Sequence, residues 1–83
     1  MDHIARTPKQ IGAILSRLRN LAHPSQNDLG QTAGLRQATI SKIESGSPTT
    51  QIDSICNVLA ALDLELHIVP RRKDGVQSIE DLF

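Results

Sequence analysis

The chain has 83 residues, a formal net charge of zero and an aromatic content of 1%, with Phe83 as the single aromatic residue. This length has room for one domain. Strands favour aromatic and β-branched residues, so the composition favours an aliphatic core of short helices over a sandwich or barrel. No apolar run is long enough to span a bilayer, and Cys56 has no second cysteine with which to form an intrachain disulfide. We expect a soluble protein of the cytoplasm that binds no metal, cofactor or membrane.

The charges are unevenly distributed along the chain. Residues 1–62 contain six basic and four acidic residues, whereas residues 63–83 contain three basic and five acidic residues. A basic front half and an acidic end predict two surfaces with different partners, of which the basic one suits nucleic acid.

A first helix is predicted to begin at Thr7 and Pro8 and to end at His23-Pro24. Thr7 is a good N-cap, Pro8 suits the first helical position, and Gln10 stands where a capping box requires it. The helix is amphipathic, because five apolar residues recur at helical spacing. These residues are Ile11, Ile14, Leu15, Leu18 and Leu21.

Two short helices are predicted next, over Ser25–Ala33 and Gln37–Ser45, with a turn centred on Gly34 between them. Ser25 and Asp28 form a helix start signal, and the glycine supplies the left-handed conformation that ends the first of the two. This order and spacing are typical of a helix-turn-helix unit, whose second helix enters the major groove through its N-terminal residues. The residues predicted to face the core are Leu29, Ala33, Ile40 and Ile43.

A fourth helix is predicted from a start signal formed by Thr50 and Asp53. Cys56 lies on its apolar face, so we expect a core residue there rather than a nucleophile. The other members of that face are Ile52, Ile55, Leu59 and Leu62.

After Asp63 the apolar period changes to two, which predicts one β-strand over residues 64–69 with Leu64, Leu66 and Ile68 on one face. The chain offers this strand no partner strand. An open apolar strand aggregates unless it is paired, and pairing with a second copy gives a two-fold homodimer. The operator is then expected to be an inverted repeat, with half-sites about 34 Å or a multiple apart. We therefore predict a domain over residues 1–69 and a flexible tail over residues 70–83.

The start of the second short helix carries side chains that can hydrogen-bond base edges. Glutamine suits adenine, arginine and lysine suit guanine, and a small alanine permits close approach or contact with a thymine methyl group. The predicted base contacts are Arg36, Gln37, Ala38, Ser41 and Lys42. No nucleophile, base and orienting residue are grouped along the chain, so we do not expect an enzyme.

Three blocks, Ser25–Leu29, Ala33–Leu35 and Ala38–Gly46, resemble the Cro/C1-type (XRE) helix-turn-helix family over roughly residues 11–64. The resemblance implies a mainly α, lambda-repressor-like domain of four to five helices. It implies that Gln26 contacts a phosphate and braces Gln37, and that Arg19 and Glu44 form a buried ion pair. The predicted phosphate contacts are Ser25, Gln26, Thr39, Ser45 and Thr50.

One residue departs from the family pattern. Gly30 stands where the family usually has alanine. By helix propensity alone, this glycine is expected to loosen its helix by up to about 1 kcal/mol.

Within that family, the segment Arg36–Ser41 and the strand over residues 64–69 resemble the Hip-type antitoxins. This likeness implies a nucleoid-associated repressor of its own operon that binds a HipA-like Ser/Thr-kinase toxin. Leu82 and Phe83 at the acidic end are candidates for docking on that toxin. Two alternatives are a stand-alone repressor without a toxin and an interaction module that neutralises a partner, with DNA binding secondary.

Overall fold

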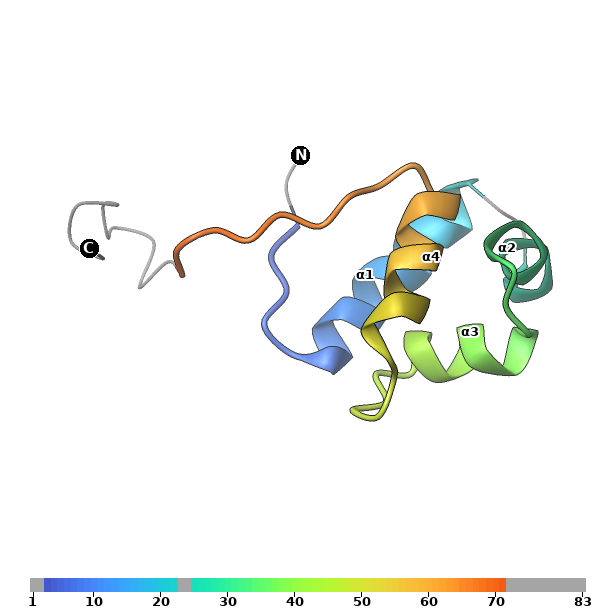
Figure 1. Cartoon of the computed structure of the whole chain (residues 1–83), viewed down its shortest axis with the longest axis horizontal. Coiled ribbons are helices and arrows are strands. Elements are labelled where there is room, and N and C mark those ends of the chain that lie inside the picture. The colour runs from blue at the N-terminus through green and yellow to red at the C-terminus, as the bar shows by residue number, and fades with distance from the viewer. Residues whose placement is uncertain (1–2, 23–24, 72–83) are drawn as a thin grey trace.

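Four helices form the part of the chain that the computed structural model describes, residues 3–22 and 25–71. They are α1 (Pro8–Ala22), α2 (Gln26–Ala33), α3 (Gln37–Glu44) and α4 (Ile52–Ala61) (Figure 1). Within those residues there is no β-strand, and no helix is long and apolar enough to cross a membrane. The predicted mainly α fold is therefore confirmed.

Side chains at the starts of α1 and α2 accept hydrogen bonds from backbone N–H groups. The Gln10 backbone N–H donates to Thr7 Oγ1 at 3.1 Å, and the Arg6 backbone N–H donates to Gln10 Oε1 at 2.6 Å. At α2, Ser25 is extended at φ −146°, and its Oγ accepts from the Asp28 backbone N–H at 3.0 Å. The Gln10 and Asp28 N–H groups are first-turn donors that their helices leave unpaired, whereas the Arg6 N–H lies in the segment before α1.

Gly34 ends α2 in the left-handed conformation, at φ 73°. One turn earlier, the Gly30 carbonyl accepts from the Leu35 backbone N–H at 2.8 Å. A Cβ atom at Gly30 would lie 2.6 Å from the Leu35 carbonyl oxygen. An alanine at this position would therefore require the turn to shift, which is a cost that helix propensity does not include.

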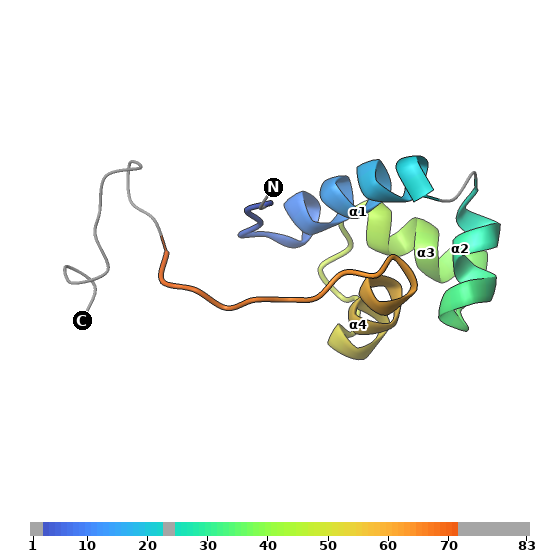
Figure 2. The same cartoon turned by 90° about the horizontal axis from the view of Figure 1, so that it is seen from above.

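Among the described residues, the core consists of five apolar side chains, one or two from each helix. They are between 0% and 3% exposed: Leu15, Leu29, Ile40, Ile43 and Val58. Helix α3 packs against both α1 and α2, and α4 packs against α2 (Figure 2). Backbones approach closely between α1 and α3, since a Cβ atom at Gly12 would lie 2.5 Å from the Ile43 carbonyl oxygen. Four of the five core residues were predicted to face inward, whereas Val58 was missed. Leu21, predicted on the same stripe as Leu15, is 80% exposed.

Helix α4 turns only part of its predicted face to the core, since Ile55, Leu59 and Leu62 are half-buried against it whereas two other predicted residues are not. Cys56 is exposed and Ile52 is 62% exposed, whereas Val58 is 1% exposed. The N-cap is Gln51 rather than Thr50, and Asp53 Oδ1 accepts from the Ser54 backbone N–H at 2.8 Å. Apolar residues surround much of this helix, so periodicity alone did not fix which of them face inward.

The predicted strand over residues 64–69 is not formed in this single chain. Asp63, at φ 59°, turns the backbone out of α4, and residues 64–71 then run away from the helices (Figure 1). Leu64 is half-buried against the core, whereas Leu66 is 56% and Ile68 94% exposed. A strand exists only where another strand supplies hydrogen bonds to its backbone, and the described residues supply none here.

Candidate nucleic-acid interface

Helix α3 has one buried face and one free face. Ile40 and Ile43 are buried in the core. The residues predicted to contact bases are all exposed and gather at the start of α3 and along its outer side. They are Arg36, Gln37, Ala38, Ser41 and Lys42. The turn around the left-handed Gly34 therefore places the start of α3 so that these side chains lie together. We call these five residues the reading surface.

The electrostatics of α3 suit an anionic partner at its first turn. That turn contains no acidic residue, and the positive end of the helix dipole lies there. Helix N-termini bind phosphate through this dipole and through the backbone N–H groups that the helix leaves unpaired. Thr39, a predicted phosphate contact in the same turn, is half-buried.

A chain of side-chain hydrogen bonds runs from the core to the reading surface. Arg19 donates from Nε to Glu44 Oε2 at 2.6 Å and from Nη2 to Glu44 Oε1 at 3.1 Å. Gln26 Nε2 donates to the same Glu44 Oε1 at 3.1 Å. Gln37 Nε2 donates to Gln26 Oε1 at 3.2 Å. The structure thus brings together the two pairs that the family resemblance implied and adds the Gln26–Glu44 contact that joins them.

The inner half of this chain is buried. The side chains of Arg19 and Glu44 are 11% and 7% exposed. Burial disfavours ionisation of Glu44, but hydrogen bonds from Arg19, Gln26 and Ser16, with the Arg19 charge, outweigh it and hold the pKa of Glu44 below its ordinary value. The hydrogen bond with Glu44 raises the pKa of Arg19. Both groups are therefore charged at neutral pH, and the pair ties α1 to α3.

The other predicted phosphate contacts are placed differently. Ser25 and Gln26 lie at the start of α2, where the Gln26–Gln37 hydrogen bond joins them to the reading surface. Ser45 is exposed at the far end of α3, and its Oγ donates to the Lys42 carbonyl at 2.9 Å. The Thr50 hydroxyl is buried and has no hydrogen-bond partner among the described residues. A phosphate cannot reach this hydroxyl in the free chain, although the residue as a whole is only half-buried.

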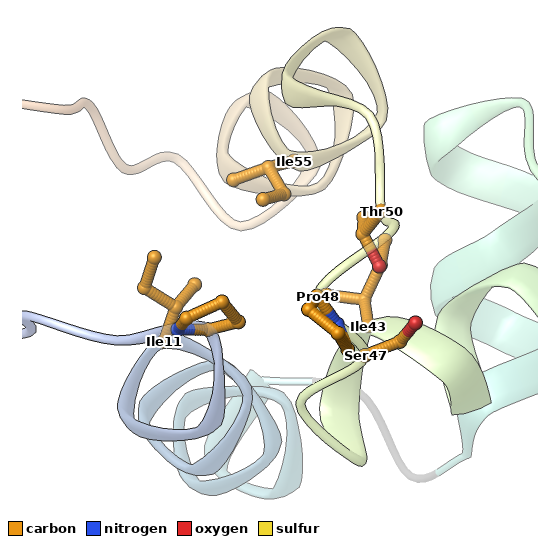
Figure 3. A pocket seen from close by; sticks show the side chains of 7 residues that line it. Ile11, Ile43, Ser47, Pro48, Thr50 and Ile55 are labelled. Carbon is orange, nitrogen blue, oxygen red and sulfur yellow. The ribbon is translucent and has the colours of Figure 1, made fainter.

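Thr50 instead lines a small cavity of about 60 Å³ between the start of α1, the α3–α4 loop and α4 (Figure 3). Its lining is mainly apolar and shares no residue with the reading surface: Pro8, Ile11, Ile43, Ser47, Pro48, Thr50 and Ile55. The described residues contain no group of three or more side chains that could hold a metal ion. Two further candidates, Leu82 and Phe83, lie outside the described residues.

A short helix, a glycine turn and an exposed second helix braced from the core define a helix-turn-helix DNA-binding unit. Residues 15–69 match the helix-turn-helix family model. The chain is 33% identical over 64 residues to an uncharacterized HTH-type transcriptional regulator of Sinorhizobium fredii (strain NBRC 101917 / NGR234), covering 77% of this chain and 84% of that protein. The chain therefore belongs to the Cro/C1-type (XRE) helix-turn-helix family of DNA-binding transcription regulators.

Solved structures share the fold. One chain described as part of a "HipB-O4 20mer complex" superimposes with a TM-score of 0.79 at 22% identity, covering 86% of this chain and 100% of that one. A chain from the "Structure of HipA-HipB-O2-O3 complex" does so with a TM-score of 0.78, at the same identity and coverage. At this identity the likeness concerns the fold.

Proposed function

We propose that the chain is a dimeric, sequence-specific repressor that acts as the antitoxin of a toxin-antitoxin pair and represses its own operon. The observation that carries the DNA-binding part is the exposed start of α3, whose Gln37 is held by Gln26 at 3.2 Å. Pre-positioned side chains lose less conformational entropy when they meet a base edge. We assign base contacts to the five residues of the reading surface and phosphate contacts to Ser25, Gln26, Thr39 and Ser45.

The homodimer proposal depends on the segment after α4. Leu66 and Ile68 expose apolar side chains on an extended backbone that has no neighbouring strand among the described residues. Pairing residues 64–69 with those of a second copy would satisfy that backbone and cover those side chains. Two reading surfaces at fixed spacing then match an inverted-repeat operator.

The dimer is tested by sedimentation of Leu66→Pro, which removes a backbone donor from the proposed pairing. We expect this variant to be monomeric. The matched control is Ile4→Pro, which places proline at another exposed apolar residue, in the non-helical segment before α1. The control should remain dimeric, and a dimeric Leu66→Pro would place the interface elsewhere.

The antitoxin proposal is supported by the likeness of the fold to HipB chains, one of them in a complex that also contains HipA. We propose a HipA-like Ser/Thr kinase as the second partner and the acidic end, with Leu82 and Phe83, as its docking segment. Deleting residues 79–83 should preserve operator affinity and weaken capture of such a kinase. Loss of DNA affinity in this variant would contradict the division into two surfaces. We propose that the protein represses its operon in the cytoplasm, at the nucleoid.

DNA recognition is tested by fluorescence anisotropy with the chain's own promoter region and a scrambled duplex. We expect sub-micromolar, salt-dependent binding that is selective for the promoter. Gln37→Ala should lose about 1–3 kcal/mol of discrimination at one base pair, as expected for a bidentate contact. Asn57→Ala, an exposed amide on α4, is the control and should bind as the unmodified protein does. Equal affinity for both duplexes would refute sequence-specific repression and favour an interaction module.

A further inference from the structure

The segment after α4 carries an acid and a base two residues apart, Glu65 and His67, which alternate with its apolar residues. We propose that two copies of residues 64–69 pair antiparallel with Leu66 on the two-fold axis, so that Glu65 lies opposite the partner's His67. This inference rests on the proposed function, because it specifies the register in which the homodimer forms. In this register the polar side of the segment selects a second copy of the same chain.

The polar side of the segment is available to another chain. Glu65 Oε2 and His67 Nε2 contact each other, and the two side chains are 80% and 71% exposed. Among the described residues, neither side chain has another hydrogen-bond or ionic partner. Residues i and i+2 of a strand lie on one face, so this contact is compatible with strand pairing. Both side chains therefore have room for a second contact, from a partner.

Two-fold symmetry permits few registers. Directly opposite residues of an antiparallel ladder point to the same face, so the apolar sides of both strands stay together only if one residue lies opposite its own copy. Left-handed Asp63 precedes the segment, and Pro70, which has no backbone N–H, follows it. An axis at residue 66 pairs residues 64–68, and an axis at residue 67 pairs residues 65–69. Any other axis pairs a shorter stretch.

The polar side chains distinguish these two long registers. With residue 67 on the axis, His67 opposes its own copy and Glu65 opposes the partner's Val69, which offers a carboxylate no donor. With residue 66 on the axis, Glu65 opposes the partner's His67, and symmetry repeats this pair. A carboxylate accepts and an imidazole N–H donates, so the four side chains form a closed ring in which acid and base alternate. Complementary cross-strand pairs of this kind stabilise a ladder, whereas like groups directly opposite destabilise it.

The same register covers the apolar side of the segment. Leu66 meets its own copy on the axis, and Ile68 lies opposite the partner's Leu64. In the single chain Leu64 is half-buried against the core, whereas Ile68 is 94% exposed. Each Ile68 would therefore be placed beside the edge of the partner's core. With residue 67 on the axis, Leu64 would have no opposite residue within the ladder.

The register is tested by disulfide cross-linking of single cysteines with oxidised glutathione, in a Cys56→Ser background that removes the exposed native thiol. The three variants are Glu65→Cys, Leu66→Cys and His67→Cys. Directly opposite residues have Cα atoms about 4.5–5.5 Å apart, which a disulfide can span, whereas diagonal neighbours lie about 7–8 Å apart. We expect Leu66→Cys to cross-link fastest of the three. Glu65→Cys and His67→Cys should cross-link faster with each other, in an equimolar mixture, than either does alone.

The alternative results identify which part of the reasoning fails. Fastest cross-linking of Glu65→Cys or His67→Cys with its own copy, or equal rates for all three variants, would overturn the register and leave the homodimer standing. A dimer that cross-links at none of these positions would place the interface outside the segment and also overturn the inference. An unmodified protein that sediments as a monomer would refute the homodimer of the proposed function itself.

Charge reversal tests the same register without cysteines. Glu65→Lys removes the carboxylate that faces the partner's His67, at two places in the dimer, and should raise the dissociation constant of the dimer about 2- to 30-fold. The matched control combines Glu65→Lys with His67→Glu, which restores an acid opposite a base and should bind at least as tightly as the unmodified protein. Both are measured by sedimentation equilibrium without DNA. An unchanged dissociation constant in Glu65→Lys, or a double variant no tighter than the single one, would overturn the inference.

Discussion

Replacing Arg19 with methionine removes one charge of the buried pair while preserving much of the length and apolar character of the side chain. The Glu44 carboxylate, 7% exposed, then retains the Gln26 amide but loses its ionic partner. Breaking a buried pair in this way costs about 3–5 kcal/mol, because an uncompensated charge remains inside the protein. Domains are stable by about 0.05–0.15 kcal/mol per residue, which is about 4–12 kcal/mol for 83 residues. The variant is therefore expected to lose a large part of its stability.

The assay is urea unfolding followed by circular dichroism at one fixed protein concentration, since a dimer is stabilised by its own concentration. The control is the double variant Arg19→Met with Glu44→Met, in which no charge is left buried. Replacing both partners of a buried pair with apolar residues is often neutral, so the double variant should recover most of the loss. A loss below about 1 kcal/mol for Arg19→Met alone would show that the pair is open to solvent and would refute the argument.

The pH dependence of the unfolding free energy is a second test of the Arg19–Glu44 pair. The pKa of Glu44 in the folded protein lies below its ordinary value of 4.5. Its stabilising contribution is therefore complete above about pH 4.5, the unfolded value, and is lost as the pH falls through the lower folded value. In Arg19→Met, acid instead neutralises a carboxylate that has lost its partner. The difference in unfolding free energy between the two proteins should therefore narrow toward pH 4, and a constant difference would contradict the assignment.

Three further predictions concern α2 and α4. Gly30→Ala should lower the unfolding free energy by about 1–3 kcal/mol despite alanine's higher helix propensity, since its Cβ would lie 2.6 Å from the Leu35 carbonyl oxygen; a higher melting temperature would show that the turn yields. Leu29→Ala, at a residue 0% exposed, should cost about 2–5 kcal/mol in urea unfolding, and a cost near zero would contradict its place in the core. Cys56 should react with a thiol reagent in the native monomeric Leu66→Pro variant, and reaction only in denaturant would restore the buried position predicted from periodicity.

The sequence by itself determined the features that depend on a few neighbouring residues. The caps at Thr7 and Ser25, the left-handed Gly34 and the inward Ile40 and Ile43 all follow from local hydrogen bonding or helical spacing, and the structure has each of them. These signals are strong because a helix terminus or an amphipathic face is a property of one segment. They were sufficient to place the reading surface on the free side of α3.

The tertiary structure decided what depends on contacts between segments. Periodicity permits Val58 as well as Cys56 on the inner face of α4, and only packing against α2 selects Val58. The clash at Gly30 comes from the turn folded against it, five residues along the chain. The Gln26–Glu44 hydrogen bond joins residues 18 positions apart, and no local pattern encodes it. The segment after α4 is a further example. Its alternation of apolar and polar residues predicts a β-strand, but a strand forms only where a neighbouring strand supplies backbone hydrogen bonds.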